Sequence, residues 1–131
     1  MKKLLIVSML LMGMAIPGFS QTAKIIAVVN KASWCTVCKE NGPRFEKEIM
    51  PMVMGDKNVS MVVNDLSDDK TKASSQAMLQ KAGIPSFAKE HNATGALYFV
   101  DAKSKKVISE VSLAKSNEEI KTAYMSAVAK K

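Results

Sequence analysis

Residues 25 to 40 read IIAVVNKASWCTVCKE, and this stretch decides the fold. It begins with the apolar run Ile25 to Val29, whose β-branched side chains predict a strand buried on both faces. It ends with Cys35 and Cys38, followed by a polar segment with apolar residues at helical intervals. Residues three apart on the first turn of a helix are neighbours, so the two sulfurs can bond.

The position of the cysteines predicts exchange chemistry. The N-terminus of a helix offers unpaired N–H groups and the positive end of the helix dipole, and both stabilise a thiolate. We therefore expect the pKa of Cys35 to lie below the value of about 8.5 for free cysteine. We expect Cys35 at the exposed edge and Cys38 one turn deeper and better shielded. Cys35 would then attack a disulfide in a partner, and Cys38 would resolve the mixed disulfide.

The rest of the chain alternates strands and helices. Amphipathic segments predict helices over residues 36–52, interrupted at Pro43, over 68–81 and over 117–128, with a short turn after Pro85. Apolar runs predict three further strands, at Val59 to Val63, Ala96 to Val100 and Val107 to Val111. The resulting order, β-α-β-α-β-β-α, predicts an α/β fold whose mixed four-stranded sheet carries helices on both faces.

The first twenty residues have the layout of a secretory signal peptide. Two lysines precede the apolar run Leu4 to Ile16, and a small-residue break follows at residues 17–20. This run is too short to cross a hydrocarbon core of about 30 Å as a helix. We expect cleavage after Ser20, a domain over residues 21–131, a periplasmic or secreted location and no stable membrane anchor after processing. An uncleaved anchor or a buried N-terminal helix is the alternative.

Composition excludes several classes of protein. Hydrophobic residues make up 47% of the chain and charged residues 24%, which excludes a disordered or collagen-like chain. Two cysteines and one histidine are too few for a four-cysteine zinc site or a multi-histidine metal centre. Disulfide exchange through Cys35 and Cys38 requires no metal or organic cofactor, so we expect none. The net charge of +7 comes from lysines spread along the chain. That spread favours a solvated basic surface over nucleic-acid binding.

The segment of strand, tryptophan, CxxC and helix resembles the thioredoxin family, and the resemblance spans roughly residues 24–130. Lys39 follows the second cysteine, and Pro43 lies where thioredoxins carry a proline that kinks the active-site helix. The resemblance implies a minimal thioredoxin fold, without the strand and helix that thioredoxin carries before this core. It also implies a thiol–disulfide oxidoreductase that acts on protein thiols and disulfides and is reset by a redox-recycling partner protein.

The same resemblance implies a substrate surface around Trp34, Thr36 and Val37. Two departures from the family concern the chemistry. Thioredoxins carry a buried acid six residues before the first cysteine, where this chain has Val29, so proton transfer must use water, Lys31 or no assisting group. The dipeptide between the cysteines matches neither reductants nor strong oxidants of the family, and without a histidine there we expect no strong oxidase.

A third departure concerns the cis-proline that faces the cysteines in the family. Gly83-Ile84-Pro85-Ser86 resembles the local motif, but a helical pattern follows it. Alignment on the Ala96 to Val100 strand places Thr94 and Gly95 at the site instead. We prefer Thr94 and Gly95, because the strand fixes the position more firmly than a tripeptide does. Glycine there tolerates unusual backbone angles, and the Thr94 backbone would pair with an extended substrate.

Two other functions remain open at the level of sequence. Cysteine sulfur and the methionines Met50, Met52 and Met54 are soft ligands, which permits a copper-binding protein. Packing in the core and at the helix end is the plainer interpretation of these methionines. The third hypothesis is a non-catalytic interaction module that keeps the cysteines as a structural disulfide.

Overall fold

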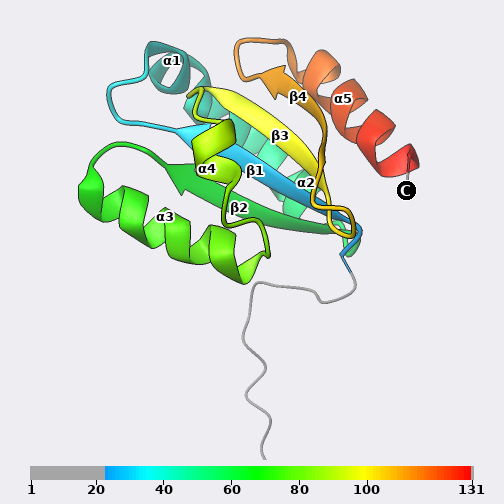
Figure 1. Cartoon of the computed structure of the whole chain (residues 1–131). Helices are drawn as coiled ribbons and strands as arrows, with labels where there is room; N and C mark the ends of the chain where they lie inside the picture. The colour runs from blue at the N-terminus through cyan, green and yellow to red at the C-terminus, as the bar shows by residue number, and fades with distance from the viewer. Residues whose placement is uncertain (1–22, 131) are drawn as a thin grey trace, which may run out of the picture.

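The computed structural model describes residues 23–130, so the predicted signal peptide, residues 1–20, lies outside the described residues. The apolar run after Lys24 forms the central strand β1 (Ile25–Lys31). It pairs in parallel with β2 (Val59–Asp65) and antiparallel with β3 (Ala96–Asp101). The last strand, β4 (Val107–Ser112), pairs antiparallel with β3, which gives the order β2-β1-β3-β4 (Figure 1).

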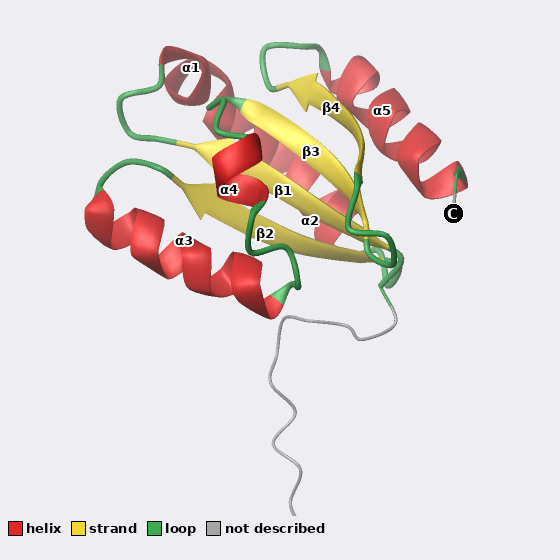
Figure 2. Ribbon diagram, viewed as in Figure 1, coloured by secondary structure: helices red, strands yellow, loops and turns green. Residues whose placement is uncertain are grey.

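Helical segments cover both faces of this sheet (Figure 2). The first helical region comprises α1 (Thr36–Arg44), the π-helical turn η1 (Phe45–Ile49) and α2 (Met50–Met54). The others are α3 (Asp69–Lys81), the short α4 (Phe87–Glu90) and α5 (Asn117–Ala129). The predicted element order and the mixed four-stranded sheet are confirmed.

Alternation along β1 divides the core into two layers. Ile25, Ala27 and Val29 face the layer built with η1, α2 and α5. Ile26 and Val28 face the layer built with α3 and α4. All five side chains are almost fully buried, as expected for a strand covered on both faces. This central position fixes the carboxyl end of β1, from which the cysteine segment leaves the sheet.

Local sequence signals explain where the helices begin and change. The side chains of Asp68 and Ser116 cap α3 and α5, each in a capping box that pairs two otherwise free N–H groups. The predicted interruption at Pro43 is displaced: α1 continues through Pro43 to Arg44, and the geometry changes at Phe45. A proline removes one helical N–H donor, and the π-helical turn begins two residues later.

Within residues 23–130, no helix combines the length and the apolar character needed to cross a membrane.

Candidate active site

The chain turns sharply between the end of β1 and the start of α1. The Cys35 N–H donates to the Ala32 carbonyl at 3.2 Å, and Cys35 then takes the extended conformation of a residue that caps a helix. Its sulfur accepts a hydrogen bond from the Cys38 N–H at 3.2 Å. Cys35 and Cys38 form a disulfide, with their Cα atoms 5.2 Å apart. The predicted proximity of the two sulfurs is confirmed.

The exposure of the two cysteines is the reverse of the prediction. Cys35 is buried, with 6% of its surface exposed, whereas Cys38 is only half-buried. As the capping residue, Cys35 turns its sulfur over the end of the helix and toward Gly95. Cys38 lies on the first turn and borders a cavity. The expectation of an exposed Cys35 and a shielded Cys38 was therefore wrong for the disulfide form.

Gly95 lies directly against the cysteine segment. Its φ is +74°, and a Cβ atom built on it would lie 3.5 Å from the Cys35 sulfur and 2.8 Å from a side-chain carbon of Val37. Only glycine adopts this backbone conformation without strain. Both backbone groups of Gly95 are bonded: its N–H donates to the Asn30 carbonyl and its carbonyl accepts from the Leu113 N–H, each at 2.8 Å.

Thr94 precedes this contact and is half-buried. No hydrogen bond joins its N–H or carbonyl group to any other described residue. Two backbone groups next to Gly95 thus have no hydrogen-bond partner among residues 23–130. This is the placement that alignment on the Ala96 to Val100 strand gave.

Pro85 occupies a different position. It lies between α3 and α4, where its carbonyl accepts a hydrogen bond from the Gln76 side chain at 2.8 Å. Together with Trp34 it borders a groove on the α3 and α4 side of the molecule. Every peptide bond within residues 23–130 is trans. The segment facing Cys35 is therefore Thr94-Gly95, without a cis-proline.

Two buried asparagines hold the segment that carries Gly95. Asn30 is fully buried, and its amide donates to the carbonyls of His91 and Ala93 at 2.9 and 3.1 Å. The Asn64 amide donates to the side-chain oxygen of Asn30 at 2.9 Å. These bonds fix residues 91–95 over the carboxyl ends of β1 and β2, because a buried amide must be paired to be tolerated.

Arg44 supports the site from the other side. Its guanidinium donates to the carbonyls of Leu113 and Lys115 at 2.7 and 2.9 Å and also to the Asn117 side chain. The Leu113 N–H bonds the Gly95 carbonyl. One end of α1 is thereby tied to the loop that supports Gly95.

Sequence reasoning missed Asn30, Asn64 and Arg44. A usable signal existed for the first two, since each asparagine follows an apolar strand run. Asn30 and Asn64 are also partners in the register of two parallel strands. Arg44 carried no signal, because its partners lie about seventy residues along the chain.

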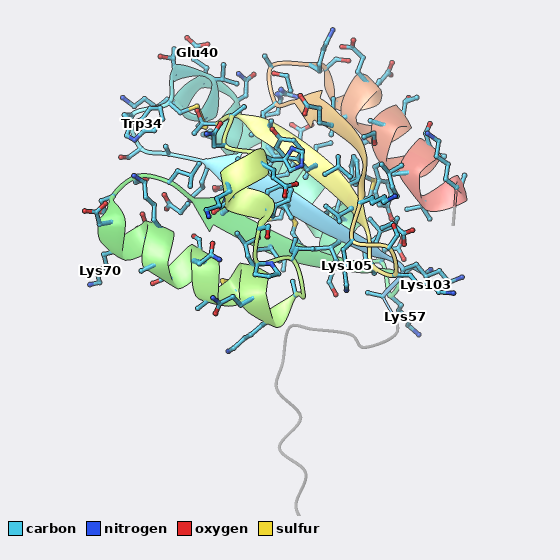
Figure 3. The ribbon with its side chains drawn as sticks, viewed as in Figure 1. Trp34, Glu40, Lys57, Lys70, Lys103 and Lys105 are labelled. Atoms are coloured by element: carbon cyan, nitrogen blue, oxygen red, sulfur yellow. A yellow bond between two sulfur atoms is a disulfide. The ribbon has the colours of Figure 1, made fainter. Side chains whose placement is uncertain are left out.

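The remaining predicted residues surround the disulfide without covering it. Trp34 projects from the loop before α1 (Figure 3) with 61% of its surface exposed. Thr36 is exposed, and Val37 is half-buried against Gly95. Such a rim of one large aromatic and one small polar side chain suits contact with another protein.

The predicted soft ligands differ in their surroundings. Within residues 23–130, no three side chains of His, Cys, Asp or Glu gather in a metal-binding arrangement. Met50 and Met52 pack against the core, whereas Met54 is exposed. For Met50 and Met52 the packing interpretation is confirmed.

Comparison with known proteins identifies the fold. No protein-family model and no curated protein matches the sequence. A solved structure described as a "putative protein disulfide isomerase" from Bacteroides thetaiotaomicron is similar, with a TM-score of 0.51 and 19% identity over 78% of this chain and 70% of that one. Thioredoxin from Wuchereria bancrofti gives a TM-score of 0.50 and 14% identity over 82% of this chain and 83% of that one. The chain therefore has a thioredoxin-like fold with a CxxC disulfide at the start of its first helix.

Proposed function

We propose that this protein is an exported thiol–disulfide oxidoreductase that exchanges disulfides with other proteins through Cys35 and Cys38. The observation that carries the proposal is the position of the pair at the start of α1, where the Cys38 N–H already points at the Cys35 sulfur. When the disulfide opens, the same N–H and the helix dipole stabilise Cys35 as a thiolate.

In the proposed reaction, the Cys35 thiolate attacks one sulfur of a target disulfide, and the other target sulfur leaves as a thiolate. Cys38 then loses its proton and attacks the Cys35 sulfur, which releases the second target thiolate and restores the Cys35–Cys38 disulfide. The target gains two electrons and two protons, and the protein becomes oxidised. The reverse sequence oxidises a dithiol, and a recycling partner returns the pair to its starting state.

Access to Cys35 requires a movement. Cys35 is buried while it is bonded to Cys38. Opening the bond leaves its side chain free to rotate outward between Trp34 and Thr36, both of which are exposed. The free backbone groups of Thr94 would then pair with the target chain next to its disulfide.

The proposed export rests on the signal-peptide layout of residues 1–20 and on the cysteine pair, since disulfides persist in exported proteins. Mass spectrometry of the protein recovered from a cell fractionation tests it. We expect a periplasmic or secreted chain that begins at Gln21, and a full-length cytoplasmic chain would contradict export.

Reduction of insulin by dithiothreitol tests the exchange activity. We expect the protein to accelerate the reaction and Cys35→Ser to abolish the acceleration. Reduced Cys38→Ser, mixed with insulin after the dithiothreitol has been removed, should be trapped as a mixed disulfide between Cys35 and insulin. Ser74→Ala, on the exposed face of α3, serves as the matched control with retained activity. Full activity in Cys35→Ser would refute the proposal.

A further inference from the structure

A cavity of about 370 Å³ lies beside Cys38. Cys38 borders it and Cys35 does not. Exposed side chains, among them Ser33, Lys39 and Glu46, form part of its lining, so it opens to the surface. Its volume falls in the range of small-molecule sites, which begins at about 300 Å³.

We propose that this cavity admits a low-molecular-weight thiol, which attacks the Cys38 sulfur and reduces the disulfide from the cavity side. The inference rests on the proposed exchange function and adds a second route by which a thiol reaches the Cys35–Cys38 disulfide. Protein targets would meet Cys35 beside Thr94, whereas small thiols would meet Cys38 in the cavity.

The surroundings of the two sulfurs support this division. Cys35 is 6% exposed and is packed beside Gly95 and Val37. Cys38 is half-buried and faces space large enough for a small molecule. A thiolate must contact the sulfur that it attacks, and in the disulfide form it is Cys38 that borders this cavity.

The choice of leaving group favours the same site of attack. A thiolate that attacks the Cys38 sulfur displaces Cys35, and the displaced Cys35 sulfur already accepts the Cys38 N–H at the helix end. The more stable thiolate leaves faster. Attack on Cys35 would instead displace Cys38, which lies inside the first turn.

Charge in the cavity suits a thiol that enters as an anion or as a zwitterion. Lys31 and Lys39 contribute two cations to the lining, and Glu46 and Asp65 contribute carboxylates. Burial of Asp65 opposes ionisation, but hydrogen bonds from Ser67 and the nearby Lys31 outweigh it, so the pKa of Asp65 lies below its ordinary value. The Asp65 carboxylate accepts hydrogen bonds from Ser67, and the exposed Lys39 offers a cation to an incoming thiolate.

The reaction uses two molecules of the small thiol. The first bonds to Cys38 while the Cys35–Cys38 bond breaks and its electron pair stays on Cys35. The second attacks the sulfur of the first, which releases Cys38 as a thiolate and forms a small symmetrical disulfide. The protein gains two electrons, and the two protons of the small thiols pass to the solvent or to the cysteines.

The position of the first bond tests the inference directly. The oxidised protein is mixed with 2-mercaptoethanol, an uncharged probe, and quenched in acid early in the reaction, before the mixed disulfide rearranges. The freed thiol is then blocked with N-ethylmaleimide, and both adducts are located by tandem mass spectrometry. We expect about a tenfold excess of the mixed disulfide on Cys38, because the leaving group and the access act in the same direction.

A cavity-filling variant provides an independent measurement. Gly42 borders the cavity, and a Cβ atom there would meet no atom within 4 Å. Gly42→Leu should therefore fold, and we expect it to slow reduction by 2-mercaptoethanol about tenfold by occupying the cavity. Glu40→Leu adds the same side chain to the outer face of α1 (Figure 3), away from the cavity, and should react at the wild-type rate.

Mixed disulfide found mainly on Cys35, an even split between the cysteines, or a Gly42→Leu variant reduced as fast as the wild type would each overturn the inference. None of these results depends on insulin turnover. A protein that fails with insulin but forms the Cys38 adduct would contradict the proposed function alone. A protein that reduces insulin but forms the Cys35 adduct would contradict only the proposed attack of small thiols on Cys38.

Discussion

At the scale of single residues, Gly95 links the cysteine pair to the sheet. Its φ is positive, and its N–H and carbonyl groups are both hydrogen-bonded. A Cβ atom added to it would lie 2.8 Å from a side-chain carbon of Val37. Val37 is β-branched and lies in the first turn of α1, where its side chain has little rotational freedom. A methyl group at position 95 would therefore meet a neighbour that cannot easily move away.

We predict that Gly95→Ala destabilises the oxidised protein by about 2–4 kcal/mol, because it adds steric overlap to backbone strain. Gly83→Ala is the matched control. Gly83 has a similar φ of +80°, but a Cβ atom there meets only the flexible end of Lys105. The control should cost about 1–2 kcal/mol, from the backbone alone.

Urea unfolding of the three proteins measures both changes. Equal losses in Gly95→Ala and Gly83→Ala would mean that Val37 yields to the added methyl group, and that the contact with α1 is not rigid.

At the scale of secondary-structure elements, the buried Asn30 joins three segments: β1, β2 and the segment 91–95. We predict that Asn30→Ala destabilises the protein by about 2–4 kcal/mol, because it leaves the buried Asn64 amide and the carbonyls of His91 and Ala93 without their partner. It should also accelerate hydrogen exchange at the Gly95 N–H, which bonds to the backbone of residue 30.

Asn92→Ala is the control for this prediction. Asn92 lies in the same segment but is exposed, and its removal should change stability by less than about 0.5 kcal/mol. Unchanged exchange at Gly95 in Asn30→Ala would show that the segment is held by its own backbone and not by the asparagine.

At the scale of the whole molecule, a single polar contact connects α5 to the turn before β2. The Tyr124 hydroxyl donates to the Asp56 carboxylate. Burial and this carboxylate raise the pKa of Tyr124 to about 12. Hydrogen bonds from Tyr124 and Asn58 hold the pKa of Asp56 below its ordinary value. The contact thus ties overall stability to pH at both extremes.

We predict that Tyr124→Phe destabilises the protein by about 1–2 kcal/mol at pH 7, since it removes one hydrogen bond to a charged group. The pKa of Asp56 is lower in the folded state, so its contribution is present above the unfolded value of 3.8 and is lost as the pH falls further. The pKa of Tyr124 is higher in the folded state, so its contribution is present below pH 10 and is lost as the pH rises toward 12.

Urea midpoints of wild type and Tyr124→Phe across this pH range check the prediction. The two curves should differ most between about pH 5 and pH 9 and should converge at either end. A constant difference at every pH would mean that the ring and its packing, and not the hydroxyl, account for the effect.

The sequence by itself determined the element order, the two capped helices and the placement of Cys35 and Cys38 at the start of α1. Each of these depends on neighbours within a few residues: the apolar run of β1, the capping side chains Asp68 and Ser116, and cysteines three residues apart. Hydrophobic periodicity and helix capping depend on residues that are close in sequence, so both can be recognised from a single sequence.

Only the tertiary structure decided which sulfur is shielded and what lies against it. The burial of Cys35 comes from Gly95, sixty residues away, and Gly95 is held by Asn30 and by the loop that Arg44 supports. The cavity beside Cys38 likewise joins side chains from several elements. These contacts follow from strand pairing and helix packing between distant segments, and the spacing of residues along the chain does not encode distances of that kind.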